Sequence, residues 1–170
     1  MNRLVFKVVN CLGTIMIILS TFFSSWSLDV RMGEQRPTIT ANIFQKINIA
    51  KLNGNFQKFD DQLAIIVKYF AIALLCCAIL VTILSLVEAA IDENHRKLLK
   101  IFTLIFAVLV CVCVIVIFVL DIVFVRKNTI VQPNGYTLKP MMENGMYFMI
   151  MGGFFNGLFS IYSIALSGKR

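Results

Sequence analysis

Long apolar runs separated by short polar segments dominate the pattern along the chain. Four runs predict helices, at about residues 4–26, 55–90, 97–125 and 145–167. A helix needs about 20 apolar residues to cross about 30 Å of hydrocarbon, and each run provides them. The pattern therefore predicts an all-α membrane protein, a four-helix bundle that occupies residues 1–170 as a single domain, with longer external loops at 27–54 and 126–144.

Strict alternation replaces the continuous apolar pattern after the first run. Two alternating segments flank the turn sequence GEQRP. Their apolar positions are Trp26, Leu28, Val30 and Met32, then Ile39, Ala41 and Ile43. A period of two is typical of half-buried strands, so residues 27–32 and 38–43 are predicted to pair as an antiparallel hairpin outside the membrane. A short strand from 128–132 is expected nearby, where it would cover an edge of the hairpin.

Composition and charge agree with a membrane protein and predict its orientation. Hydrophobic residues make up 59% of the chain, more than a soluble domain of 170 residues can bury. The net charge is +7, and basic residues are densest at the two termini and in the short connection ENHRKLLK. These parts are predicted to be cytoplasmic, in a multi-pass protein of the cell membrane. The first run exceeds a usual signal-peptide core, so it is predicted to be retained.

Two charged residues lie inside the predicted spans. Asp121 is about 6 Å below the outer end of the third helix and Lys68 about 9 Å below that of the second, from the helical rise per residue. The two helices are expected to be antiparallel neighbours, so the favoured interpretation is an intramembrane ion pair that fixes their register. Two alternatives remain open: independent snorkelling of Lys68, or a proton or ion relay through Asp121.

The fourth predicted helix is rich in small and polar residues. They are Gly152, Gly153, Asn156, Gly157 and Ser160. Such residues let a second helix approach closely. Packing within the bundle is the favoured interpretation, and self-association or docking to another membrane protein is the alternative.

Catalytic, cofactor and metal sites are not predicted. The five cysteines all lie in apolar runs, and Asp121 is the one aspartate embedded in a span. The sequence has no cluster with zinc spacing, no phosphate loop and no serine elbow. Basic residues are not interleaved with aromatics in a soluble domain, so nucleic acid is not an expected partner, whereas an anionic lipid surface is.

The layout resembles the claudin-like superfamily of four-span (tetraspan) membrane proteins. The features that carry the resemblance are Trp26 at the outer end of the first helix, the hairpin of 27–43, the segment NTIVQ in the second loop and the glycine-rich fourth helix. The resemblance implies cytoplasmic termini, an external antiparallel sheet and action through lateral protein contacts. The W-x-x-W motif and the two loop cysteines of true claudins are absent, so tight-junction sealing is not implied.

The favoured function is therefore a structural, adhesion or accessory membrane subunit. It would act through its external sheet and fourth helix, with the lipid bilayer and other membrane proteins or a second copy as partners. One alternative is a small transporter or channel-forming subunit that uses Lys68 and Asp121. Another is a membrane immunity or sensor protein that recognises an external peptide.

Overall fold

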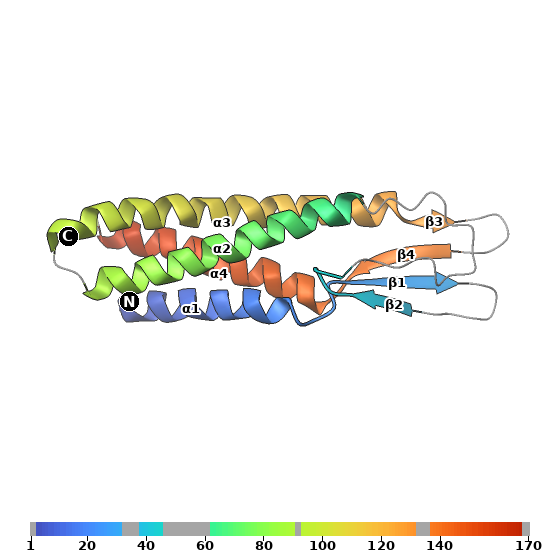
Figure 1. The fold of residues 1–170 in the computed structure, drawn as a ribbon, viewed down its shortest axis with the longest axis horizontal. Helices are drawn as coiled ribbons and strands as arrows, with labels where there is room; N and C mark the ends of the chain where they lie inside the picture. The colour runs from blue at the N-terminus through green and yellow to red at the C-terminus, as the bar shows by residue number, and fades with distance from the viewer. Residues whose placement is uncertain (1–2, 32–37, 46–61, 91–92, 132–136, 168–170) are drawn as a thin grey trace.

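The computed structural model describes residues 3–31, 38–45, 62–90, 93–131 and 137–167 (Figure 1). In this part of the chain, four helices form a bundle and a small sheet extends from one end of it. The helices are α1 (Arg3–Ser20), α2 (Gln62–Ala90), α3 (Glu93–Lys127) and α4 (Asn144–Ser167). The strands are β1 (Trp26–Arg31), β2 (Thr38–Ala41), β3 (Ile130–Val131) and β4 (Thr137–Met142). Both chain termini lie toward the end opposite the sheet (Figure 1).

Within the described ranges, three helices have the length and apolarity needed to cross a membrane. Their apolar segments are Gln62–Glu88, Arg96–Lys127 and Asn144–Leu166, with mean hydropathies of 2.9, 3.4 and 1.5. The outside of the bundle is apolar as well: Ile115, for example, is 55% exposed. These helices indicate a membrane protein. The apolar part of α1, Val5–Ser20, is shorter.

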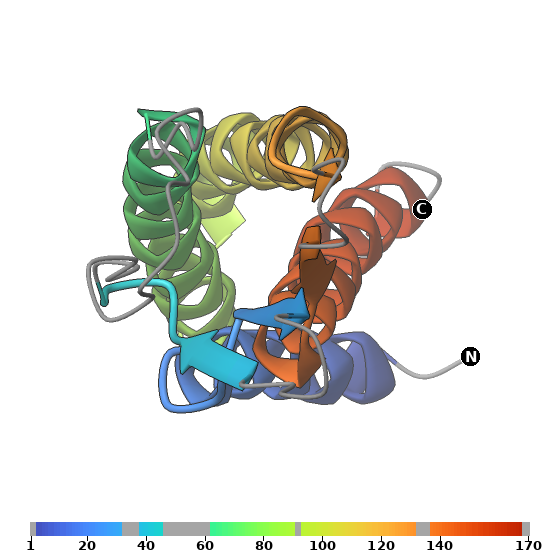
Figure 2. The same cartoon turned by 90° about the vertical axis from the view of Figure 1, so that its right-hand side faces the viewer.

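The helices form a ring when the bundle is viewed from the sheet end (Figure 2). In that view α1 lies beside α2 and α4, and α3 closes the ring on the other side, which agrees with the contacts between the helices. The core runs without a break from the bundle into the inner face of the sheet.

The first helix ends at Ser20, well before the predicted end at residue 26. Its last turn is tightened: the backbone N–H groups of Thr21 and Phe22 donate to the carbonyls three residues back, at 3.1 and 3.0 Å. The Ser20 Oγ and the Thr21 Oγ1 also donate to carbonyls of this turn, at 2.6 and 2.7 Å, and such bonds satisfy carbonyls at a helix end. Trp26 is consequently the first residue of a strand and not part of the helix.

The other predicted helix bounds differ less. The predicted start of the second helix at residue 55 lies outside the described residues, which enter α2 at Gln62. The third helix starts at Glu93 and not at 97, so the connection to α2 is shorter than predicted. The fourth predicted helix, 145–167, corresponds to α4.

The predicted hairpin is present, and the strand expected within 128–132 is present as β3, but β3 does not lie directly beside the hairpin. β1 pairs antiparallel with β2 from Trp26↔Ala41 to Asp29↔Thr38. The sheet order is β2-β1-β4-β3, so β4 and not residues 128–132 lies next to β1. β3 is a two-residue edge strand that pairs with β4.

Pro140 explains why the sequence does not predict β4. A proline within a run is a signal against a central strand, because it lacks the N–H donor. Among the described residues, β3 pairs only with Thr137 and Leu138, so β4 has a free edge at Pro140. The proline is therefore tolerated while β4 pairs with β1 along its full length.

The sheet has an apolar inner face and a polar outer face. Trp26, Leu28 and Val30 are buried, as are Ala41 and Ile43, and Ile39 is half-buried. Met32 lies outside the described residues. On the outer face Arg31 and Lys139 are exposed, and Lys139 is the cross-strand partner of Asp29. The alternation read from the sequence thus separates the two faces of β1, with Ser27 buried as well.

The register of β1 against β4 is testable with an engineered disulfide. Directly opposed residues have Cα atoms about 4.5–5.5 Å apart, within disulfide range. Asp29→Cys with Lys139→Cys should therefore form a disulfide on mild oxidation, measured by mass spectrometry of the linked peptide. The control pairs Arg31→Cys with Lys139→Cys, which are offset by two positions and about 7–8 Å apart diagonally. Equal yields from the two pairs would contradict the register.

Candidate functional site

Asp121 lies where α3 meets the sheet, and its partner is Trp26. The side chain is fully buried, and the Trp26 Nε1–H donates a hydrogen bond to its Oδ1 at 2.5 Å. The indole ring also packs against Phe124, with ring centroids 5.6 Å apart. The second carboxyl oxygen, Oδ2, has no hydrogen-bond partner among the described residues. This contact joins the first residue of the sheet to a helix residue 95 positions further along the chain.

The structure corrects the prediction of an ion pair between Lys68 and Asp121, because each side chain has a different partner. Lys68 is half-buried, and its Nζ donates to the Phe44 carbonyl at 3.4 Å, in the segment that follows β2. The depth of two residues along antiparallel helices predicts that they lie at a similar height in the bundle, but not that their side chains point toward each other. Val67 faces the core, and Lys68 is turned from it by about 100° around the helix axis.

Sequence reasoning missed Trp26 as the partner because it placed this residue at the end of a helix. A signal was nevertheless present. An indole N–H that is buried needs an acceptor. Asp121 was the one embedded carboxylate, at a depth close to the start of the predicted sheet.

A second group of polar side chains lies deeper in the bundle, where α1, α2 and α4 meet. We call it the central polar cluster; its members are Asn10, Thr14, Thr82, Asn156 and Ser160. The Asn156 Nδ2 donates to the Asn10 Oδ1 and the Thr14 Oγ1, both at 2.8 Å. The Thr82 Oγ1 donates to the Asn10 Oδ1 at 2.7 Å. The Asn10 Nδ2 donates to the Ser160 Oγ, which donates to the Asn156 carbonyl at 2.6 Å.

This cluster joins three helices through side-chain hydrogen bonds. Its side-chain donors find acceptors within the cluster, and Asn156 and Ser160 are buried. Hydrogen bonds between membrane helices contribute about 0.6 kcal/mol each on average, with a maximum of about 1.7. Several bonds that share Asn156 therefore fix the register of α1, α2 and α4 together.

The small residues of α4 pack against two other helices of the same bundle. A Cβ on Gly152 would lie 2.6 Å from the Gly13 carbonyl of α1, and one on Gly157 would lie 2.6 Å from the Cys111 Sγ of α3. A Cβ on Gly153 would collide with the Val114 side chain, also of α3. The structure thus places the predicted helix-packing residues in contacts within the chain.

An apolar layer separates the central polar cluster from Asp121. Leu74 of α2, Val114 and Ile117 of α3, and Met146 and Met149 of α4 are buried, and along their helices they lie toward the sheet end from the level of Asn156. Along α4, Asn156 of the cluster lies about 18 Å by helical rise from Asn144, where the helix begins at the sheet end. The described residues therefore provide no continuous polar path through the bundle.

Chemistry of other kinds finds little support in the described residues. They contain no group of three or more His, Cys, Asp or Glu side chains that could hold a metal ion. The five cysteines are free and lie on helices. The contacts of Trp26 with Asp121 and Phe124 hold the sheet against the bundle.

Comparison with known proteins does not identify the chain. No protein-family model matches it, and no curated protein matches it either. The resemblance to the claudin-like superfamily consequently stays a prediction from the layout.

The Trp26–Asp121 contact predicts a specific pattern of stability changes. Asp121→Leu leaves the indole N–H buried without an acceptor and should cost about 1–3 kcal/mol of unfolding free energy. Asp121→Asn keeps an acceptor oxygen and should cost less. Combined with Trp26→Phe, Asp121→Leu should show a coupling energy of about 0.5–3 kcal/mol in a double-mutant cycle measured in detergent.

The matched control for this cycle is Lys68→Met. Its effect should add to that of Asp121→Leu within about 0.5 kcal/mol, because the two side chains do not touch. Coupling with Lys68 and additivity with Trp26 would restore the ion pair and reject the assignment.

The packing around α4 predicts that alanine substitutions of two glycines lower the stability to different extents. A Cβ on Gly13 would lie 2.6 Å from the Gly152 carbonyl and 2.7 Å from the Asn156 backbone nitrogen, neither of which can move alone. Gly13→Ala should therefore lower the melting temperature more than Gly153→Ala, whose obstacle is the Val114 side chain. Adding Val114→Ala should rescue Gly153→Ala but not Gly13→Ala. Equal losses with no selective rescue would contradict this packing.

Proposed function

We propose that the protein is a four-span membrane protein that acts as a structural or accessory subunit. In this proposal α1 spans the membrane with the other helices, because its 18 residues reach about 27 Å, close to the hydrocarbon thickness. Its contacts with α4 and its share of the central polar cluster support this role. The sheet then stands outside the cell and both termini lie in the cytoplasm, in keeping with the distribution of basic residues.

The apolar layer between the two buried polar sites is the observation that carries the proposal. A transporter needs polar groups along a path, and here Asp121 and the cluster are each engaged locally and separated from one another. This weakens the alternative of a small transporter or channel-forming subunit that uses Lys68 and Asp121. The third possibility, an immunity or sensor protein, would use the same external sheet to bind a peptide.

Two outward surfaces are suited to contact other proteins. One is the outer face of the sheet, with exposed Arg31 and Lys139. The other is the part of α4 nearest the sheet, where Tyr147 and Met151 are 54% and 47% exposed, one turn apart. Aromatic residues, Met and Arg are enriched at protein interfaces. The small residues of α4 are engaged within the bundle, so a lateral partner would meet this outward face.

Photo-crosslinking in intact cells tests the proposal. A photoreactive side chain at Lys139 or Tyr147 should form adducts with a discrete polypeptide. The control at Phe118, which is 45% exposed on α3, should not. Charge reversal by Arg31→Glu, whose cross-strand partner is the uncharged Thr137, should lower the adduct yield at Tyr147 without changing the melting temperature.

A different pair of results would contradict the proposal. Absence of protein adducts at both test positions, together with solute flux in proteoliposomes that Asp121→Asn abolishes, would replace the subunit proposal with transport.

A further inference from the structure

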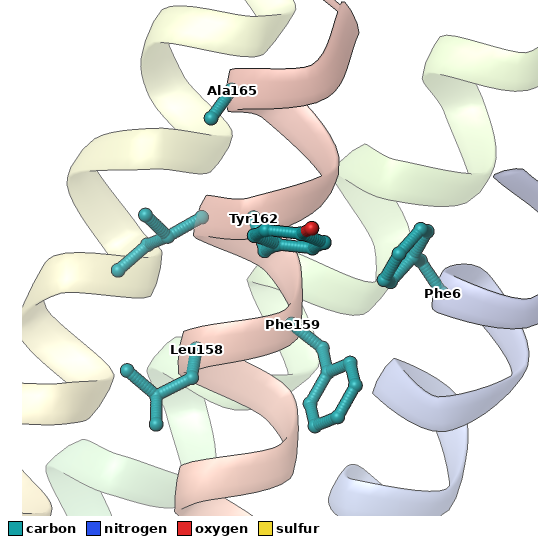
Figure 3. A pocket seen from close by; sticks show the side chains of 6 residues that line it. Phe6, Leu158, Phe159, Tyr162 and Ala165 are labelled. Carbon is teal, nitrogen blue, oxygen red and sulfur yellow. The ribbon is translucent and has the colours of Figure 1, made fainter. Parts of the chain in front are cut away.

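A groove lies on the outer surface of α4, beside the start of α1 (Figure 3). Its volume is about 440 Å³, and its lining residues are Phe6, Leu158, Phe159, Ile161, Tyr162 and Ala165. The Phe6 ring meets Tyr162 edge-on, with centroids 5.4 Å apart, and lies 6.2 Å from Phe159. The lining is thus hydrocarbon and aromatic rings, with the Tyr162 hydroxyl as its polar side-chain group.

The groove starts near the C-terminal end of α4 and follows the surface of this helix toward its middle. Ala165 is two residues from Ser167, where α4 ends, and Leu158 is two turns further in. From Ala165 to Leu158 the distance along the axis is about 10 Å. This segment lies within the candidate span Asn144–Leu166, so the groove opens at headgroup level and leads into hydrocarbon.

These dimensions favour a slender occupant. A helix is about 10–12 Å in diameter and packs along several turns, so a trough of two turns is too short to accept one. An acyl chain begins at the headgroup level and runs inward, which matches the course of the groove. Leu158 and Tyr162 are 51% and 54% exposed, so the chain would cover apolar surface that no other part of the described structure covers.

The charge at this end of the bundle selects the headgroup. Lys7 follows Phe6 on α1, and Arg96, Lys97 and Lys100 lie in the first turns of α3. Among the described side chains at this end, Glu88 is the acidic one. Clusters of basic residues beside a span attract anionic lipids.

We propose that the groove binds one acyl chain of an anionic phospholipid, whose headgroup lies at the basic end of the bundle. The Tyr162 hydroxyl can hydrogen-bond at the groove while its ring contacts the chain. This proposal is independent of any protein partner, because the groove and the sheet-proximal face of α4 do not overlap.

Native mass spectrometry of the purified protein tests the proposal. Phosphatidylglycerol and phosphatidylcholine with identical acyl chains are added in equal amounts. We expect one phosphatidylglycerol per chain, retained about tenfold over phosphatidylcholine because of the basic residues. Lys97→Gln with Lys100→Gln should reduce the preference between headgroups, because two of the four basic residues are removed.

A matched pair of variants tests the groove itself. Ala165→Phe fills the groove and should lower phosphatidylglycerol retention about tenfold. Ala73→Phe places the same ring at an exposed position of α2, outside the groove, and should leave retention unchanged. If Ala165→Phe impairs folding, the smaller Ala165→Leu provides the same comparison.

Three outcomes would overturn the proposal. Equal retention by the Ala165 and Ala73 variants would place the lipid elsewhere. Equal retention of the two headgroups by the unmodified protein would reject the anionic preference. A dimer in mild detergent that Ala165→Phe dissociates, with no bound lipid, would make a second copy the occupant.

Discussion

The hydrogen bond between Trp26 and Asp121 is the interaction on which the arrangement of sheet and bundle depends. Trp26 is the first residue of β1, and it pairs with both β2 and β4. Its indole reaches into the bundle to a buried carboxyl of α3. One side chain therefore connects the sheet to α3, which is not adjacent in the sequence to either strand of the hairpin. A buried carboxyl in an apolar core is costly unless it is bonded, so this position strongly favours a single docking geometry.

The helices are held together by a different principle. Apolar side chains gain little by leaving lipid for another apolar surface, so membrane helices associate through close packing and polar contacts. α1 uses both. Gly13 brings its backbone against α4 at Gly152, and Asn10 bonds Asn156 nearby. The shortest apolar helix is consequently the one most firmly joined to a neighbour.

The sequence predicted the elements better than their contacts. Apolar runs and alternation predicted the helices and the β1–β2 hairpin, because both periods follow from which face is buried. The predicted end of α1 was wrong because Phe22, Phe23 and Trp26 continue the apolar run past Ser20, where the helix ends. β4 was missed because Pro140 masks a strand that has a free edge. The Lys68–Asp121 pair was wrong because depth along a helix does not give the direction in which a side chain points.

The short connections from α1 to β1, through residues 21–25, and from β4 to α4, through Glu143, have a consequence for length. β1 follows α1 and β4 precedes α4, and backbone bonds from Glu143 and Gly145 to Ser25 and Ser24 continue the pairing between them. A strand can slip only by two residues if its faces are to be kept, which is about 6.8 Å, or more than four residues of helix. The sheet thus fixes the heights of α1 and α4 relative to one another. Insertions and deletions between Ser20 and Trp26 should be rare in any functional variant, whatever happens to the composition of the helices.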